Sequence, residues 1–153
     1  GQTAWQLNPV TGAMLLTGRQ LDQMKQQADP LAALTPEKYI KSAETVEKTT
    51  FDGKEAYKVK VVLHTGEDYV EIYDAKTALN IGSIRKTETQ MGAVETTSTV
   101  TEYQKFDGHM MSTRVKQSMM GMDQVLTITS VEFAALPATT FELPKEIKAL
   151  TAK

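Results

Sequence analysis

The chain has 153 residues, 41% of them hydrophobic, and its 17 basic and 19 acidic side chains give a formal net charge of -2. This length is typical of one domain with its own core, so we expect a single domain over residues 1–153. The slightly acidic balance argues against nucleic acid and against a polybasic membrane surface as partners. Because the sequence has no cysteine, disulfides, thiolate metal ligands and thiol nucleophiles are excluded.

The start of the chain predicts a fragment or a processed form. The sequence opens on Gly1-Gln2-Thr3-Ala4-Trp5, a strand-like stretch without an initiator methionine. No apolar run reaches the roughly 18 residues of a membrane-spanning helix, and no charged start followed by an apolar segment marks a signal peptide. We therefore expect a soluble mature chain whose upstream portion is missing.

Two short strands and a helix are predicted at the N-terminal end. Residues 4–7 and 13–16 have strand composition, and the Asn8-Pro9-Val10-Thr11-Gly12 run between them is typical of a turn. Thr17 and Gln20 have the spacing of a capping box at the start of a helix over 18–28, which Asp29-Pro30 should end. One side of this helix carries an apolar stripe made of Leu21, Met24 and Ala28, and we expect Leu21 and Met24 to be buried.

Residues 39–46 fit two structures. After Thr35-Pro36, the spacing of the apolar side chains is loosely helical, which predicts a second helix. The same residues also alternate as in a strand, and we prefer the strand.

Seven strands are predicted from there on, because Thr, Val, Ile and Tyr alternate with polar residues. Their ranges are 39–51, 55–65, 68–74, 79–90, 94–105, 110–119 and 124–133. Glycine-containing turns separate nearly all of them: Phe51-Asp52-Gly53-Lys54, His64-Thr65-Gly66-Glu67, Gln90-Met91-Gly92-Ala93, Phe106-Asp107-Gly108-His109 and Met120-Gly121-Met122. Short turns of this kind join neighbouring strands. The prediction is therefore a mainly β (α+β) fold, a curved antiparallel meander sheet of about seven or more strands with the amphipathic helix across its concave face.

Alternation along each strand also predicts which side chains face inward. The expected inward side chains are Tyr57, Val59, Val61, Leu63, Val70 and Ile72. The expected outward, solvated side chains are Lys58, Lys60 and His64. A curved sheet with a helix across it either closes into a plain core or leaves a cleft for an apolar ligand. Both alternatives remain open on the sequence alone.

No catalytic or metal-binding pattern is present. The two histidines, His64 and His109, lack the spacing that places two imidazoles on one helix face. A nucleophile elbow and a phosphate-binding loop are also missing. The carboxylates Glu67, Asp68, Glu71 and Asp74 fit a solvated strand face. We therefore predict no enzymatic activity, no cofactor and no metal.

Methionine is concentrated in one predicted hairpin. Five of the eight methionines lie there: Met110, Met111, Met119, Met120 and Met122. They fit three hypotheses, namely filling of an irregular core, an adaptable apolar lip for a ligand or partner, and a Cu(I) site together with His109. The second hypothesis adds Met111, Val115 and Met119 to the apolar side chains that would contact a ligand.

Several motifs together resemble a known family. They are Trp5 with Asn8-Pro9 and Gly12, Gly18 before a helix, Phe51-Asp52-Gly53-Lys54-Glu55-Ala56-Tyr57-Lys58-Val59, Tyr73-Asp74-Ala75-Lys76-Thr77-Ala78-Leu79, Tyr103-Gln104-Lys105-Phe106-Asp107-Gly108 and Phe141-Glu142-Leu143-Pro144. In order and spacing they resemble the LolA-like family of outer-membrane lipoprotein-sorting proteins, over most of the chain. The sequence departs from the family at Gly108-His109-Met110-Met111, where an apolar residue and a proline are usual.

The resemblance implies a half-barrel of antiparallel strands in the bacterial periplasm or another extracytoplasmic place. It also implies helices over the concave side, an apolar cavity for acyl chains and upstream strands that this chain lacks. Such domains are also attached to larger proteins, including peptidases.

Two functions follow as expectations. The first is a non-enzymatic extracytoplasmic domain that binds a lipid, a lipoprotein acyl chain or another apolar ligand in the sheet cleft. The expected ligand contacts are Tyr57, Val59, Val61, Leu63, Val70, Ile72, Met111, Val115 and Met119. The alternative is a structural or interaction module appended to or cut from a larger bacterial protein, such as a peptidase. The oligomeric state is left open.

Overall fold

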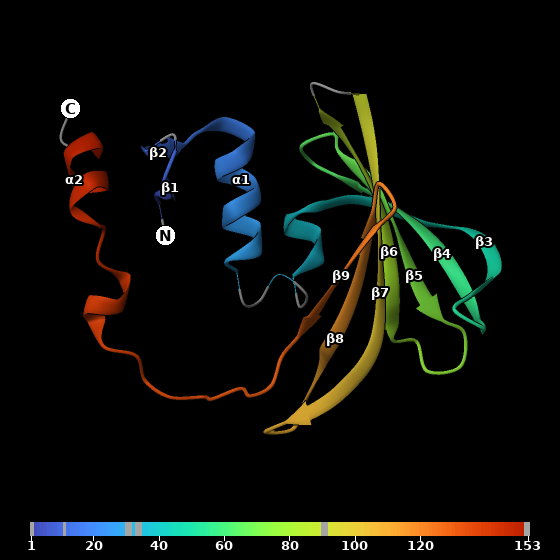
Figure 1. The fold of residues 1–153 in the computed structure, drawn as a ribbon. Coiled ribbons are helices and arrows are strands. Elements are labelled where there is room, and N and C mark those ends of the chain that lie inside the picture. The colour runs from blue at the N-terminus through green and yellow to red at the C-terminus, as the bar shows by residue number, and fades with distance from the viewer. Residues whose placement is uncertain (1, 11, 30–31, 33–34, 90–91, 152–153) are drawn as a thin grey trace. The chain divides into compact units, whose positions relative to one another are not determined.

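The computed structural model describes residues 2–10, 12–29, 32, 35–89 and 92–151 (Figure 1). The chain forms two compact units. One unit consists of Gly1–Tyr39 together with Phe133–Lys153, and the other consists of Ile40–Glu132.

The second unit is a meander of seven antiparallel strands, drawn from teal to orange in Figure 1. The strands are β3 (Ile40–Phe51), β4 (Lys54–Leu63), β5 (Asp68–Asp74), β6 (Asn80–Thr89), β7 (Gly92–Phe106), β8 (His109–Met119) and β9 (Met122–Thr127). Each strand pairs with the next along the chain, so β3 and β9 are the two edges of an open sheet in the described residues. The predicted mainly β fold class with an antiparallel meander is confirmed.

Strand boundaries differ from the prediction mainly at the end of the last strand. The last strand ends at Thr127 instead of residue 133. The ladder between β8 and β9 ends at the level where the β7–β8 pairing has two register shifts, between Val100 and Tyr103. Bulges of this kind twist a strand away from its neighbour, which explains why β9 ends there. The alternative helix after residue 36 is limited to one 3-10 turn, η1 (Pro36–Lys38), and the strand prediction holds from Ile40 on.

Tight turns with two central residues close three of the hairpins. In each, both central residues are left-handed, as a type I′ turn requires: Asp52 (φ 47°) and Gly53 (φ 75°), Asp107 (φ 45°) and Gly108 (φ 84°), and Met120 (φ 51°) and Gly121 (φ 77°). The predicted glycine turns are confirmed at these places. For the turn predicted at Gln90-Met91-Gly92-Ala93, Gln90 and Met91 lie outside the described residues.

The pairing register divides the sheet into two faces, because residues directly opposite each other in an antiparallel pair project to the same side. Tyr57 on β4 is opposite Tyr73 on β5, whereas Lys58 is opposite Ile72 and Lys60 is opposite Val70. We call the side of Tyr57 and Tyr73 the tyrosine face, and the side of Lys58 and Lys60 the lysine face.

One part of the predicted inward face is therefore wrong. Val70 and Ile72 lie on the lysine face, on the opposite side of the sheet from Tyr57 and Val61. The cause is the β4–β5 turn, which pairs Val62 with Asp68, so that odd-numbered residues meet odd-numbered residues. The lysine face is also not purely solvated, since it carries buried apolar side chains near one end.

Burial follows the prediction only in part. Val61 and Leu63 are buried, Leu21 and Val59 are partly buried, and Met24 and Tyr57 are exposed. The prediction that all of these side chains would be buried is right for the first two.

An apolar cluster on the lysine face forms the core of this unit. Its fully buried members are Ala56, Ile72 and Ile81, and Phe51, Val70 and Ile84 pack against them. A Cβ placed at Gly82 on β6 would lie 2.6 Å from Cε1 of Phe51 on β3. The two strands are three positions apart, about 14 Å in a flat sheet at about 4.8 Å per strand. The sheet must therefore coil toward this face, and Gly82 provides the space for the Phe51 ring.

We predict that Gly82→Ala destabilises the sheet by about 1–3 kcal/mol, because the new methyl group would also lie 2.6 Å from the carbonyl oxygen of Ser98, which is backbone and cannot move aside. Urea unfolding measures the effect. The neighbouring Ser83→Ala is the control and should change the free energy of unfolding by less than about 0.5 kcal/mol. Equal effects of the two substitutions would contradict the proposed packing.

The first unit contains a two-stranded sheet and short helices. Its elements are η1, already described, and β1 (Ala4–Asn8), β2 (Gly12–Leu16), α1 (Gly18–Gln27), η2 (Ala138–Phe141) and α2 (Lys145–Thr151). The two predicted strands and their turn are confirmed: the strands pair, and the backbone N–H of Val10 donates to Oδ1 of Asn8 at 2.8 Å. Thr11 of that turn lies outside the described residues.

The predicted helix is present, but its predicted cap is wrong. The Thr17 side chain makes no capping hydrogen bond, and Gly18 enters the helix with φ 54°. This left-handed entry changes the backbone direction that a capping box needs. The sequence analysis also missed α2, which follows Pro144 and buries Ile147 while contacting β2. Whether α1 crosses the concave side of the sheet stays a prediction.

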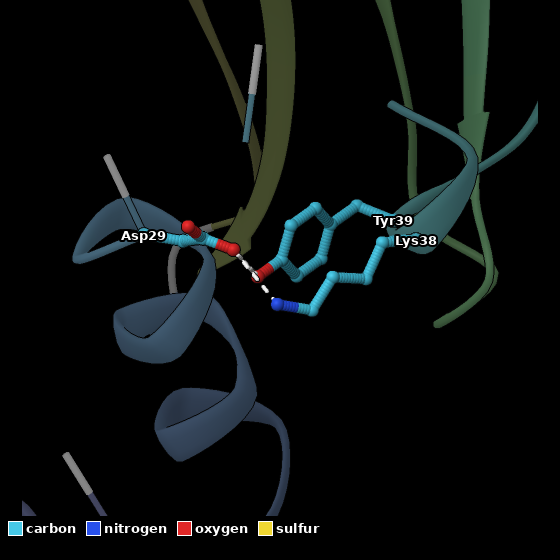
Figure 2. A network of polar contacts seen from close by, with 3 residues as sticks. All are labelled: Asp29, Lys38 and Tyr39. Carbon is cyan, nitrogen blue, oxygen red and sulfur yellow. Dashed lines mark hydrogen bonds and ion pairs between the residues drawn. The ribbon is translucent and has the colours of Figure 1, made fainter. Parts of the chain in front are cut away.

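A polar network connects the residues that follow α1 to η1 (Figure 2). The Asp29 carboxylate accepts hydrogen bonds from Lys38 Nζ at 2.8 Å and from the Tyr39 hydroxyl at 2.6 Å. The ammonium of Lys38 also lies 5.0 Å from the centre of the Tyr39 ring. The hydrogen bond of Lys38 to Asp29, with smaller contributions from Tyr39 and from the Asp29 charge, raises the pKa of Lys38. The network ties Asp29, which follows the helix, to Lys38 at the end of η1 and to Tyr39. Pro30, which was expected to end the helix, lies outside the described residues.

Candidate functional site: an uncharged patch on the tyrosine face

Three neighbouring strands carry a regular block of uncharged side chains on the tyrosine face. Each row of the block crosses β7, β8 and β9 in register. The rows are Thr96, Met119 and Met122; Ser98, Gln117 and Gln124; and Val100, Val115 and Leu126. We call these nine residues the uncharged grid.

Charged side chains of the same strands project to the other side. Lys116 and Asp123 lie on the lysine face and form an ion pair at 2.7 Å. Glu95 lies on that face too, opposite Lys86, with which it forms an ion pair at 3.7 Å. The alternation along β7, β8 and β9 thus separates charged from uncharged side chains, and the tyrosine face keeps the uncharged ones.

The grid is apolar along two rows and open to solvent. Met119 is 41% exposed, Met122 is 62% exposed and Leu126 is 63% exposed. A hollow of about 60 Å³ lies over part of the grid and is lined by Thr96, Gln117, Met119, Met122 and Gln124. Enclosed ligand pockets usually measure about 300–1,000 Å³. A ligand of the grid would therefore lie across the open surface, with only a small part of it in the hollow.

A larger hollow on the other side of the sheet has a different chemistry. It measures about 210 Å³ and is lined by Lys60, Asp68, Tyr69, Val70, Ile84 and Lys86. Lys60 and Asp68 form an ion pair at 2.9 Å across its rim. The hydrogen bond from Lys60 lowers the pKa of Asp68, with a smaller effect of the Lys86 charge, so this carboxylate stays ionised. An apolar ligand would have to displace the water around these charges, and the grid is the better apolar site.

Aromatic side chains border the grid toward the middle of the sheet. Arg85, opposite Thr96 in the register, lies over the ring of Tyr69 with its guanidinium carbon 3.9 Å from the ring centre. The Tyr73 hydroxyl donates to the carboxylate of Glu71 on the same face. Burial and this hydrogen bond raise the pKa of Tyr73 to about 12. The tyrosine face therefore changes from polar aromatic at β5 to uncharged and apolar at β9.

The structure places most of the predicted ligand contacts on the tyrosine face, but only two of them in the grid. Val115 and Met119 belong to the grid, and Tyr57, Val59 and Val61 lie on the same face at β4. Leu63 alternates with them and is buried.

Three of the predicted contacts lie elsewhere. Val70 and Ile72 are on the lysine face, and Ile72 is fully buried in the core. Met111 lies at the opposite end of β8 from Met119, about 26 Å away at about 3.3 Å per residue.

The five methionines lie in one hairpin, formed by β8 and β9, as predicted, but they form two separate groups. Met119, Met120 and Met122 flank Gly121, while Met110 and Met111 begin β8 beside the β7–β8 turn. Four of the five are exposed and Met111 is partly buried, so filling of the core is the wrong hypothesis for these four. The hypotheses of an apolar lip and of a Cu(I) site stay predictions.

The sequence analysis missed most of the grid. The missed residues are Thr96, Ser98, Val100, Gln117, Gln124 and Leu126, whereas Met122 was named among the clustered methionines but not as a ligand contact. A signal was present, because Val115, Gln117 and Met119 alternate with the polar or charged residues Lys116 and Ser118. Counting charges separately on each face of each predicted strand would have found it.

The described residues contain no group of three or more His, Cys, Asp or Glu side chains placed to hold a metal ion. His109 begins β8 and is opposite Phe106 across the turn, while His64 follows Leu63 at the end of β4. In the same part of the chain, no helix is long and apolar enough to cross a membrane.

No family model, no curated protein and no solved structure matches the chain. The similarity to LolA-like proteins therefore stays an interpretation of the sequence motifs. Function is inferred from the side chains of the two faces.

We predict that Tyr73 is among the last tyrosines to ionise. Between pH 10 and about 12 the unfolded chain releases this phenol proton before the folded chain does, so the free energy of unfolding should fall over that range. Ultraviolet titration of tyrosinate follows ionisation directly, and Tyr73→Phe should remove a component near pH 12. An unchanged high-pH end of the titration in this variant would contradict the assignment.

Proposed function

We propose that the chain is a non-enzymatic domain that binds an acyl chain, or a similar apolar ligand, across the uncharged grid. The observation that carries this proposal is the exposed apolar surface of Met119, Met122 and Leu126 on a block of nine residues without any charge. Single exposed apolar residues are common, but several exposed apolar side chains grouped on one uncharged block are typical of a binding surface.

The chemistry of the grid suits a flexible chain. Methionine is unbranched and polarisable, so Met119 and Met122 can adapt to chains of different length. If the acyl chain and the grid together remove about 300 Å² of apolar surface from water, the binding free energy gains about 8 kcal/mol. This value corresponds to a Kd of about 1 µM, and the ordering of the ligand weakens it.

The middle row of the grid adds polar groups that can form hydrogen bonds. Ser98, Gln117 and Gln124 offer a hydroxyl and two amides between two apolar rows. An amide both donates and accepts hydrogen bonds, so these groups suit the ester or amide linkage of an acyl ligand. The absence of charge in the grid disfavours a ligand whose bound part is itself charged.

The sequence motifs agree with this proposal, since the LolA-like family that they resemble handles acyl chains. The same resemblance supports an extracytoplasmic place in a bacterium. A second candidate function is an interaction module of a larger protein. The observation that favours it is the exposed edge strand β9, whose six residues are all exposed.

We predict that Met119→Glu weakens binding of a fluorescent fatty acid at least about tenfold, because it places a charge in the centre of the apolar row. Met110→Glu is the matched control. It changes a second exposed methionine of β8, 54% exposed, at the far end of the strand. Its binding should stay within about twofold of the original chain. Melting temperatures of both variants show whether the sheet is intact. Equal losses in the two variants, or no saturable binding by the original chain, would overturn the proposal.

A further inference from the structure

The two edges of the sheet differ in how they are protected. β3 carries two register shifts and exposed charged side chains, among them Lys41, Glu44 and Glu47. Bulges and charges of this kind keep an edge strand from pairing with another chain. β9 pairs with β8 without any register shift and has one charged residue, Asp123. The β9 edge therefore lacks the protection that the β3 edge has.

The β9 edge is also accessible. All six of its residues are exposed, and in the part of the chain that the structure describes no strand pairs with its outer side. Val125 is 53% exposed, close to the 52% of Val46 on β3. An accessible, regularly paired and weakly charged edge strand of this kind is a template for a further strand.

The hydrogen-bond pattern shows which backbone groups point outward. The N–H of Ile128 donates to the carbonyl oxygen of Thr113 on β8 at 2.8 Å, so Ile128 points toward β8. Successive residues of a strand direct these groups to alternate sides. Leu126, Gln124 and Met122 therefore also point toward β8. The residues that direct their N–H and C=O groups outward are Asp123, Val125 and Thr127.

We propose that β9 pairs with β9 of a second copy of this chain, antiparallel and about a two-fold axis at Val125. In this register Val125 lies opposite Val125 of the second copy, and Asp123 lies opposite Thr127 of the second copy. Every outward residue then exchanges both backbone hydrogen bonds with its opposite residue. The interface is isologous, as a closed dimer requires.

The side chains fit this register on both faces. On the lysine face, the Thr127 hydroxyl of one copy can donate to the Asp123 carboxylate of the other, and no like charges are opposed. On the tyrosine face, Gln124 lies opposite Leu126 of the second copy, and Met122 lies opposite Ile128 of the second copy. The uncharged grids of the two copies thus become one continuous surface. A register that opposed Asp123 to itself would place two carboxylates side by side, which is unfavourable.

Sedimentation velocity of the ligand-free 153-residue chain tests the proposal. We expect a monomer–dimer equilibrium that shifts toward dimer as the concentration rises to the order of 100 µM, because an interface built on one edge strand is small. Val125→Lys and Val125→Glu each place like charges at the two-fold axis and should abolish the dimer. An equimolar mixture of the two variants should restore it, because the opposed charges then attract.

The matched control is Val46→Lys, which adds the same charge at an equally exposed valine on the other edge. It should leave the dimer unchanged, and circular dichroism of every variant checks that the sheet is folded. A monomer at all concentrations overturns the proposal, as does equal disruption by Val46→Lys. Failure of the mixed variants to associate overturns the register at Val125. Association with an added extended peptide, with no self-association, would assign the edge to another protein instead.

Discussion

The register between neighbouring strands decides which side chains share a face, and short turns set that register. At the β8–β9 hairpin, the left-handed pair Met120 and Gly121 brings Met119 opposite Met122. This first pair sets the register of every later pair of the hairpin, including Val115 with Leu126. A slip of one residue would turn the whole set of β9 side chains to the opposite face. Asp123 would then lie on the tyrosine face, and the surface proposed to bind an apolar ligand would carry a charge.

Separation of charge between the two faces connects the fold with the proposed function. The lysine face carries exposed ion pairs such as Lys116 with Asp123, and pairs of this kind contribute little stability. Stability in this region depends on the apolar cluster around Ile72. Phe51 packs against this cluster, because Gly82 leaves space for its ring. The uncharged grid therefore lies outside this core cluster and remains exposed, with the β9 edge beside it.

Much of the sheet could be predicted from the sequence, because alternation within a strand is a local property. The pairing between strands depends on turn length and on bulges, which the residues of a single strand do not determine. Val70 and Ile72 were assigned to the wrong face because the β4–β5 turn sets the parity. Met111 was placed with Met119 because distance along a strand was not considered. The helix α2 was missed because its single buried residue, Ile147, gives almost no periodic signal.

The most direct test of this account is nuclear Overhauser spectroscopy on methyl-labelled protein. The register predicts side-chain contacts among Val100, Val115 and Leu126, which lie in one row of the tyrosine face. Val125 projects to the lysine face and should show no methyl contact with Val115 in the monomer. Contacts from Leu126 to Val115 and from Val115 to Val100 would support the separation of the two faces. Contacts from Val125 to Val115 in place of those from Leu126 would contradict it.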